Sequence, residues 1–157
     1  MHLMSERIIL EGLQKIGIIK AESDLTAVQN KGVGSLFVPY GVGHLVGLDI
    51  IDVGGYLKHT PKRSEKVNLK QLRHGRILEA GMVMSVEPGF YFDLKKIEDS
   101  SLNTEDIDRE VLESCAEIGG VRVEDLVVIT ETGCEVLTPG DFPRTVEEIE
   151  NFLISSQ

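Results

Sequence analysis

Apolar residues recur at a helical period near the start of the chain. Between residues 3 and 16 the spacing is roughly helical, and Gly17 follows as a plausible end of the helix. The apolar positions of this segment are Leu3, Ile9, Leu10, Leu13 and Ile16. Ser23 is a residue type that caps helices, so we expect a second short helix from there to about Asn30, ended by Gly32. The pattern therefore predicts two helices at the beginning of the chain.

The middle of the chain reads as strands separated by turns. Residues 35–40 (SLFVPY) are predicted to form a strand. Residues 41–56 (GVGHLVGLDIIDVGGY) indicate strand and turns, because glycines punctuate β-branched residues. Residues 81–92 (GMVMSVEPGFYF) indicate a pair of strands around a Pro-Gly turn. Residues 119–138 (GGVRVEDLVVITETGCEVLT) indicate two more strands joined by TETG, which is typical of a hairpin.

Polar segments and a capping signal complete the predicted order of elements. Residues 58–76 read as a polar loop, and residues 93–108 as an acidic surface insertion. Thr145 stands three residues before Glu148, which is the spacing of a capping box and predicts a C-terminal helix. Helices, then strands, then a helix, without a linker or repeat, predict a single α+β domain over residues 1–157.

The charge of the chain bears on its partners. The 26 acidic and 16 basic residues give a net charge of −10, which argues against a face built to bind phosphate backbones. Residues 58–76 are nevertheless basic, whereas residues 97–117 are acidic. The basic stretch is a solvated loop or helix face, or else a nucleic-acid patch. We favour the first interpretation because no aromatic side chains interleave it, and we expect no nucleic-acid partner.

Cysteine usage and hydropathy bear on the cellular compartment. Cys115 and Cys134 are far apart and lack the CxxC spacing, so they read as free thiols in a reducing compartment. No apolar run reaches the roughly 18 residues that would span a bilayer. The N-terminus also lacks the basic-then-apolar layout of a signal peptide. We therefore expect a cytoplasmic protein with no membrane partner.

Three residues in apolar, strand-like surroundings are candidates for chemistry. His44 lies among glycines, where it is either a structural histidine or a metal ligand. Glu87 is one carboxylate in an apolar strand and needs a metal, an arginine or solvent as its partner. Glu124 poses the same problem, and Arg122 on the same strand face is its simplest partner. Together, one imidazole and two carboxylates suggest a divalent cation such as Mn²⁺, Co²⁺ or Zn²⁺.

Several segments carry a family resemblance that covers nearly the whole chain. The segments are FVPYGVGHLVGLDIIDVGGY, LRHGRILEAGMVMSVEPGFYF, DREVL, GGVRVEDLVVITETGCEVLT and PRTVEEIE. They resemble the C-terminal catalytic part of the prolidases, which are Xaa-Pro dipeptidases of the pita-bread metallopeptidase family. The resemblance implies the second half of a pseudo-symmetric pita-bread fold. It also implies a two-metal centre, usually Mn²⁺, held by two Asp, one His and two Glu, that hydrolyses the amide bond before proline.

The resemblance assigns roles residue by residue. It implies that His44, Glu87 and Glu124 are metal ligands, and that the two glutamates are also catalytic. Arg73, in QLRHG, matches an arginine that clamps the free carboxylate of the substrate. Its alternative is a surface charge in a basic loop. Arg122 matches a second family arginine close to the last glutamate, and the resemblance implies that it binds substrate or supports that glutamate.

The chain departs from the family pattern at the same site. Tyr40 and Ile51 stand where the family has two histidines that flank the substrate. Tyr40 can still donate a hydrogen bond to substrate, whereas Ile51 cannot. The family's two aspartate ligands fall upstream of this sequence, so we expect one bound metal ion or none. We accordingly expect a chain that is inactive alone, or alternatively an inactive homologue that serves as a binding or scaffold protein.

Half of a pita-bread domain would leave a sheet face and edge uncovered. Exposed edges and apolar faces favour pairing with another chain. We therefore expect a homodimer, or association with the missing N-terminal half of the domain.

Overall fold

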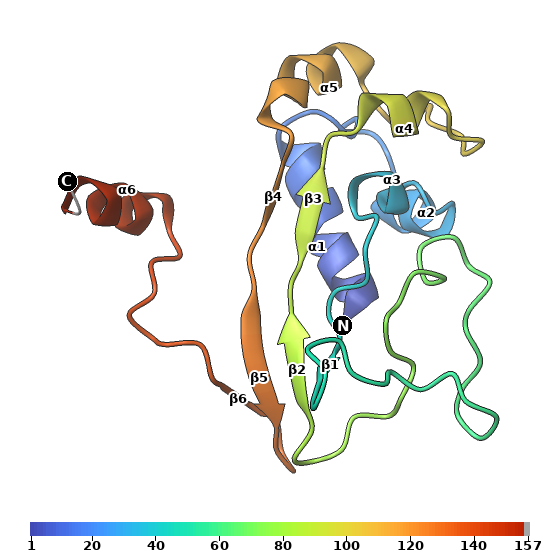
Figure 1. The fold of residues 1–157 in the computed structure, drawn as a ribbon. Helices are drawn as coiled ribbons and strands as arrows, with labels where there is room; N and C mark the ends of the chain where they lie inside the picture. The colour runs from blue at the N-terminus through green and yellow to red at the C-terminus, as the bar shows by residue number, and fades with distance from the viewer. Residues whose placement is uncertain (156–157) are drawn as a thin grey trace.

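The helices gather into one layer of the molecule, with a single exception. The computed structural model of the chain describes residues 1–155. Five helices and a short 3₁₀ turn pack together, whereas the last helix, α6, lies apart at the end of an extended stretch (Figure 1). The elements are α1 (His2–Lys15), α2 (Leu25–Asn30), α3 (Gly34–Phe37), α4 (Leu94–Glu98), α5 (Arg109–Cys115), the turn η1 (Ala116–Ile118) and α6 (Val146–Ser155).

The strands form two antiparallel sets. The larger sheet has the order β1-β2-β5-β6, and β3 pairs with β4 in a separate two-stranded sheet. In Figure 1, β2 runs on into β3 and β4 runs on into β5, so the two sets lie end to end. The strands are β1 (Leu45–Val46), β2 (Val83–Val86), β3 (Gly89–Tyr91), β4 (Gly120–Arg122), β5 (Asp125–Ile129) and β6 (Cys134–Val136). The predicted α+β class is confirmed.

The main hydrophobic core lies among the first five helices. Its fully buried members include Leu10, Ile18, Val28, Phe37 and Leu112. A second, smaller cluster on the larger sheet is built from Leu45, Met84 and Val127. The core therefore holds the N-terminal two thirds of the chain together, whereas β4, β6 and α6 contain only exposed residues.

The expected strand over residues 35–40 is wrong. Gly34–Phe37 is the short helix α3, and the chain is irregular after it. Val33, Leu36 and Phe37 are all buried in the main core. Their spacing of three and four residues places them on one face of a helical turn. Tertiary burial of that face therefore overrides the strand propensity of the segment.

Two further expectations need correction. The strands of residues 81–92 both form, but they do not pair with each other: β2 pairs with β1 and β5, and β3 pairs with β4. The chain passes straight through the Pro-Gly sequence instead of reversing (Figure 1). Residues 93–108 are not a simple surface insertion, because they contain α4 and bury Ile97 and Ile107 in the core.

Other local predictions are confirmed. The first helix forms, and the second is capped by Asp24, one residue after the expected Ser23. The segment TETG joins β5 to β6 in a hairpin. The capping box before α6 forms in both directions. Glu148 accepts hydrogen bonds from the N–H of Thr145, and Thr145 Oγ1 accepts one from the N–H of Glu148. None of the helices within residues 1–155 combines the length and apolarity that crossing a membrane requires.

Candidate functional site

A cleft of about 910 Å³ brings all six predicted site residues together. Strand ends and the loops between them supply its walls. The predicted residues that line it are Tyr40, His44, Arg73, Glu87, Arg122 and Glu124, and Ile51 lines it as well. Residues separated by up to 84 positions in the sequence therefore share one concave surface.

The pairing of β1 with β2 places His44 beside Glu87. The backbone before β1 continues the ladder, since the N–H of Ser85 donates to the carbonyl of His44 and the N–H of Glu87 to that of Val42. Gly43 permits this close approach, because a Cβ at that position would collide with the carbonyl oxygen of Ser85. Gly43 is thus needed to bring the two strands into contact.

His44 and Glu87 form a half-buried pair. His44 Nε2 lies 3.3 Å from Glu87 Oε1, and the two side chains are only 12% and 13% exposed. The other ring nitrogen, Nδ1, lies 3.1 Å from the carbonyl oxygen of Leu45. Because a carbonyl can only accept, a neutral ring that makes this bond carries its proton on Nδ1. The lone pair of Nε2 then faces a carboxylate oxygen.

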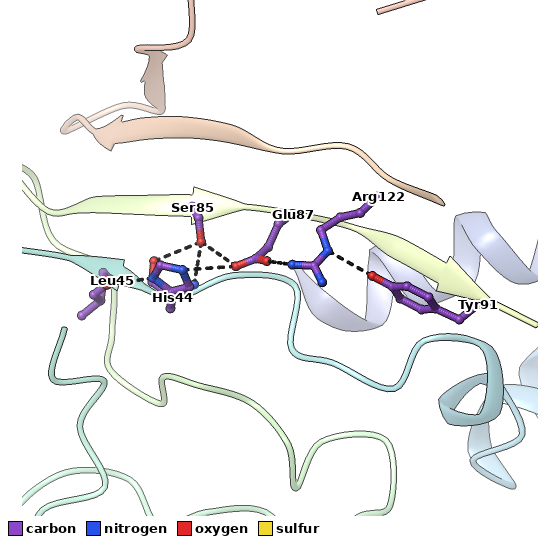
Figure 2. A network of polar contacts seen from close by, with 6 residues as sticks. All are labelled: His44, Leu45, Ser85, Glu87, Tyr91 and Arg122. Atoms are coloured by element: carbon purple, nitrogen blue, oxygen red, sulfur yellow. Dashed lines mark hydrogen bonds and ion pairs between the residues drawn. The ribbon is translucent and has the colours of Figure 1, made fainter. Parts of the chain in front are cut away.

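Glu87 is also held from two other sides (Figure 2). Ser85 Oγ donates to Glu87 Oε1 at 3.0 Å and accepts from the N–H of His44 at 3.0 Å. Arg122 Nη1 donates to Glu87 Oε2 at 2.7 Å, and Arg122 Nε donates to the hydroxyl of Tyr91 at 3.0 Å. The hydrogen bond to Tyr91 is the main cause that raises the pKa of Arg122. Desolvation opposes it, and the charge of Glu87 adds a smaller rise.

No sequence motif points directly to Ser85 or Tyr91, and the partner of Arg122 differs from the one that the sequence suggests. The ion pair of Arg122 is with Glu87 rather than with Glu124. Ser85 was detectable in principle as the one hydroxyl in the apolar run MVMSV, where a buried polar group needs partners. Tyr91 was not, because only the pairing of β3 with β4 brings it next to Arg122.

Basic residues also line the cleft. Arg63, Lys70 and Arg73 all line it, and all three come from the segment of residues 58–76. That segment forms neither helix nor strand, as expected for a loop. It is nevertheless more than a solvated face, because its cations line the same cleft as Glu87 and Glu124. A ligand with a negative end and a metal-binding or positive end would match both kinds of side chain.

Tyr40 and Ile51 occupy the cleft where the family resemblance predicts histidines. Tyr40 is 58% exposed, and its ring packs edge-on against Tyr91 with ring centres 5.5 Å apart. Its phenol can donate a hydrogen bond into the cleft. Ile51 is 48% exposed and offers only an apolar surface.

The residues present fit a divalent metal ion as part of its ligand set. His44 Nε2 and Glu87 Oε1 are two adjacent donor atoms of the kind that Mn²⁺ and Zn²⁺ accept. Glu124 lines the same cleft. Within residues 1–155, however, no three His, Cys, Asp or Glu side chains lie close enough together to hold a metal ion. A complete site would therefore need further ligands beside His44 and Glu87.

The sequence profile of metallopeptidase family M24 matches residues 7–131, which is most of the chain. The chain belongs to this family. It is 42% identical to a rat Xaa-Pro dipeptidase over 96% of its own length. It is 39% identical to a probable Xaa-Pro aminopeptidase of Verticillium alfalfae over 99% of its length. The solved structure of Pseudomonas aeruginosa aminopeptidase PepP aligns with 99% of the chain at a TM-score of 0.67 and 32% identity.

Membership of family M24 confirms the expected resemblance to prolidases and the pita-bread fold. The chain spans only about a third of the length of these relatives, however. It covers 30% of the rat dipeptidase, 33% of the fungal aminopeptidase and 28% of the bacterial structure.

Proposed function

We propose that this M24 chain provides one side of the active site of an Xaa-Pro dipeptidase. The observation that carries the proposal is the cleft itself, which two metal-binding donors share with arginine and lysine side chains. An Xaa-Pro dipeptide has a peptide bond to be cleaved and, close to it, a free carboxylate. The distribution of charge across the cleft suits both groups.

The residues divide into two roles. His44 and Glu87 would provide the first ligands of the metal, for which we propose Mn²⁺, and Glu124 would join them in the completed site. When bound, such an ion lowers the pKa of a water molecule and stabilises negative charge on the substrate. Arg73 would bind the substrate carboxylate through its planar guanidinium, and Arg122 would orient Glu87. Tyr40 would donate a hydrogen bond to substrate.

We further propose that the chain is inactive until another chain completes the site. Two adjacent donors are too few for a hydrolytic metal centre, which usually has at least three protein ligands. Ile51 provides no donor for the developing negative charge, and such a loss typically lowers the rate by about 10²–10³-fold. The completing partner would be a second copy or the complementary half of the domain. A reducing compartment such as the cytoplasm suits the two free cysteines.

Calorimetric titration of the metal-stripped chain with Mn²⁺ tests the metal-binding role. We expect saturable binding that is lost in Glu87→Ala, because the glutamate is one of the two adjacent donors. Glu135→Ala, which changes an exposed glutamate on β6, is the matched control and should bind as the original chain does. Absence of binding at millimolar Mn²⁺ would contradict the proposal for the chain alone.

A scaffold role is the second candidate, and one contact favours it. The guanidinium of Arg122 already neutralises Glu87 at 2.7 Å, so this carboxylate has a cationic partner without a metal ion. A chain that retains its fold in chelator and fails to bind Mn²⁺ would support this function. Mn²⁺-dependent cleavage of Gly-Pro would support the dipeptidase instead.

A further inference from the structure

We infer that Arg63 and Tyr56 are a positioning pair that fixes Arg73 at the edge of the cleft. The inference rests on the proposed function, in which Arg73 binds the carboxylate of the substrate. Neither member of the pair needs to touch that carboxylate. They act on the backbone that carries Arg73.

Arg63 is anchored by three contacts within its own loop. Its guanidinium carbon lies 3.9 Å from the centre of the Tyr56 ring, which is a stacked cation–π arrangement. Its Nη1 donates to the carbonyl oxygens of Lys70, at 3.0 Å, and of Leu72, at 2.6 Å. The hydroxyl of Tyr56 donates to the same Leu72 carbonyl at 3.1 Å. Both members of the pair therefore converge on the residue directly before Arg73.

The backbone on the other side of Arg73 is held as well. The N–H of Gly75 donates to the carbonyl of Gly54 at 2.8 Å. A Cβ at Gly75 would lie 2.7 Å from the Tyr56 ring, and a Cβ at Gly54 would collide with the carbonyl of Arg73. The segment from Leu72 to Gly75 is thus enclosed between the Tyr56 ring and the glycine turn.

Tyr56 itself has a backbone conformation that supports this role. Its φ of 60° makes it the one non-glycine residue with positive φ among residues 1–155. Such a conformation costs free energy in a residue that carries a side chain, and it persists where surrounding contacts determine it. Here the contacts are the stack on Arg63 and the hydrogen bond to Leu72.

The loop that carries Arg73 needs these side-chain contacts because no helix or strand orders its backbone. Residues 58–76 form neither helix nor strand, and fixing a free backbone costs about 1–2 kcal/mol per residue. A carboxylate clamp that had to be ordered on binding would lose affinity accordingly. Lysine does not replace Arg63, because an ammonium has no planar face to lie on the Tyr56 ring while it donates to the two carbonyls.

Hydrogen exchange tests the positioning directly. We compare the original chain with Arg63→Met, Arg63→Lys and the neighbouring control Lys62→Met. In both Arg63 variants the amide of Gly75 should exchange about tenfold faster, because both lose the guanidinium that stacks on Tyr56 and donates to the carbonyls of Lys70 and Leu72. Lys62→Met should exchange as the original chain does. Unchanged exchange at Gly75 in Arg63→Met overturns the inference.

Comparing a ligand that has a free carboxylate with one that lacks it distinguishes loss of Arg73 positioning from general loosening of the fold. The probes are Gly-Pro and its C-terminal amide, titrated by nuclear magnetic resonance. Arg63→Met and Arg63→Lys should both weaken binding of the acid towards that of Arg73→Met, and should leave binding of the amide unchanged. Full binding of the acid by Arg63→Lys overturns the inference, because charge alone would then suffice. If Arg73→Met binds the acid normally, the proposed role of Arg73 fails, and the exchange result still decides whether Arg63 fixes the loop.

Discussion

At the scale of single residues, Ser85 links both members of the candidate metal pair. Its side chain is fully buried, accepts from the N–H of His44 and donates to Glu87. Ser85→Ala should lower the free energy of unfolding by about 1–3 kcal/mol, because it leaves the buried N–H of His44 without a partner. Urea denaturation measures this change. Ser114→Ala, whose hydroxyl bonds within its own exposed helical turn, should change little.

The same substitution should also affect the metal. Removing a residue that orients a ligand typically weakens metal affinity by about 10–100-fold, so Ser85→Ala should weaken binding of Mn²⁺ by that amount. Equal affinity in both chains would show that Ser85 has only a structural role.

Single residues also mark how far the site could be predicted from the sequence. His44 and Glu87 stand out because an imidazole and a carboxylate in apolar strands need partners. The partner of Arg122 could not be predicted from the sequence. Residues two positions apart, such as Arg122 and Glu124, share a face of a strand, but this spacing does not say which side chains the neighbouring strand brings close. Only the register of β3 against β4, in which Gly89 lies opposite Arg122, directs the guanidinium to Glu87 and Tyr91.

At the scale of elements, the capping box of α6 should make this helix sensitive to acid. Backbone hydrogen bonds from Arg144 and Thr145 lower the pKa of Glu148 from its usual 4.5. A lowered pKa in the folded state means that the cap stabilises the helix above pH 4.5. That stabilisation is lost as the pH falls through the lower folded value.

The helical amide signals of Val146–Glu150 should therefore weaken as the pH is lowered from about 6 to about 3. Glu148→Gln is the informative variant, because glutamine accepts the same two hydrogen bonds but does not titrate in this range. Its helix should persist to lower pH. The same acid transition in both chains would mean that the cap does not control α6.

The elements that were predicted correctly are those with a local chemical signal. The capping box of α6 and the hairpin turn TETG depend on neighbouring residues alone, and both form as expected. Helix α3 was missed because its helical state depends on burial of Leu36 and Phe37 in a distant core. The predicted pairing of β2 with β3 was wrong for the same reason, because the strands that they pair with lie far along the chain: β5 pairs with β2, and β4 pairs with β3.

At the scale of the whole molecule, the chain exposes more surface than a folded monomer of its size. Its accessible surface is 10405 Å². A monomer of this length exposes about 7,800 Å², so the excess is about 2,600 Å². Standard interfaces bury only about 800 Å² per partner. Exposed apolar residues on α1, on β4 and directly after β4 contribute to the excess: Met4, Ile8, Val121 and Val123.

These four residues line an apolar groove of about 390 Å³ on the molecule. An open groove of this kind favours association. We therefore expect light scattering to report a mass above that of one chain at micromolar concentration. A double substitution in the groove, Ile8→Glu with Val123→Glu, should shift the mass to the monomer. Leu48→Glu, which makes the same kind of change on a fully exposed loop residue, is the control and should leave the mass unchanged.

Salt dependence identifies the partner in the same experiment. Two copies that each carry a net charge of −10 repel one another, so self-association should strengthen when salt screens that repulsion. A basic partner retained from the expression host would dissociate under the same conditions. A single monomeric peak at both low and high salt would contradict association of the chain. It would mean that the excess surface remains exposed to water.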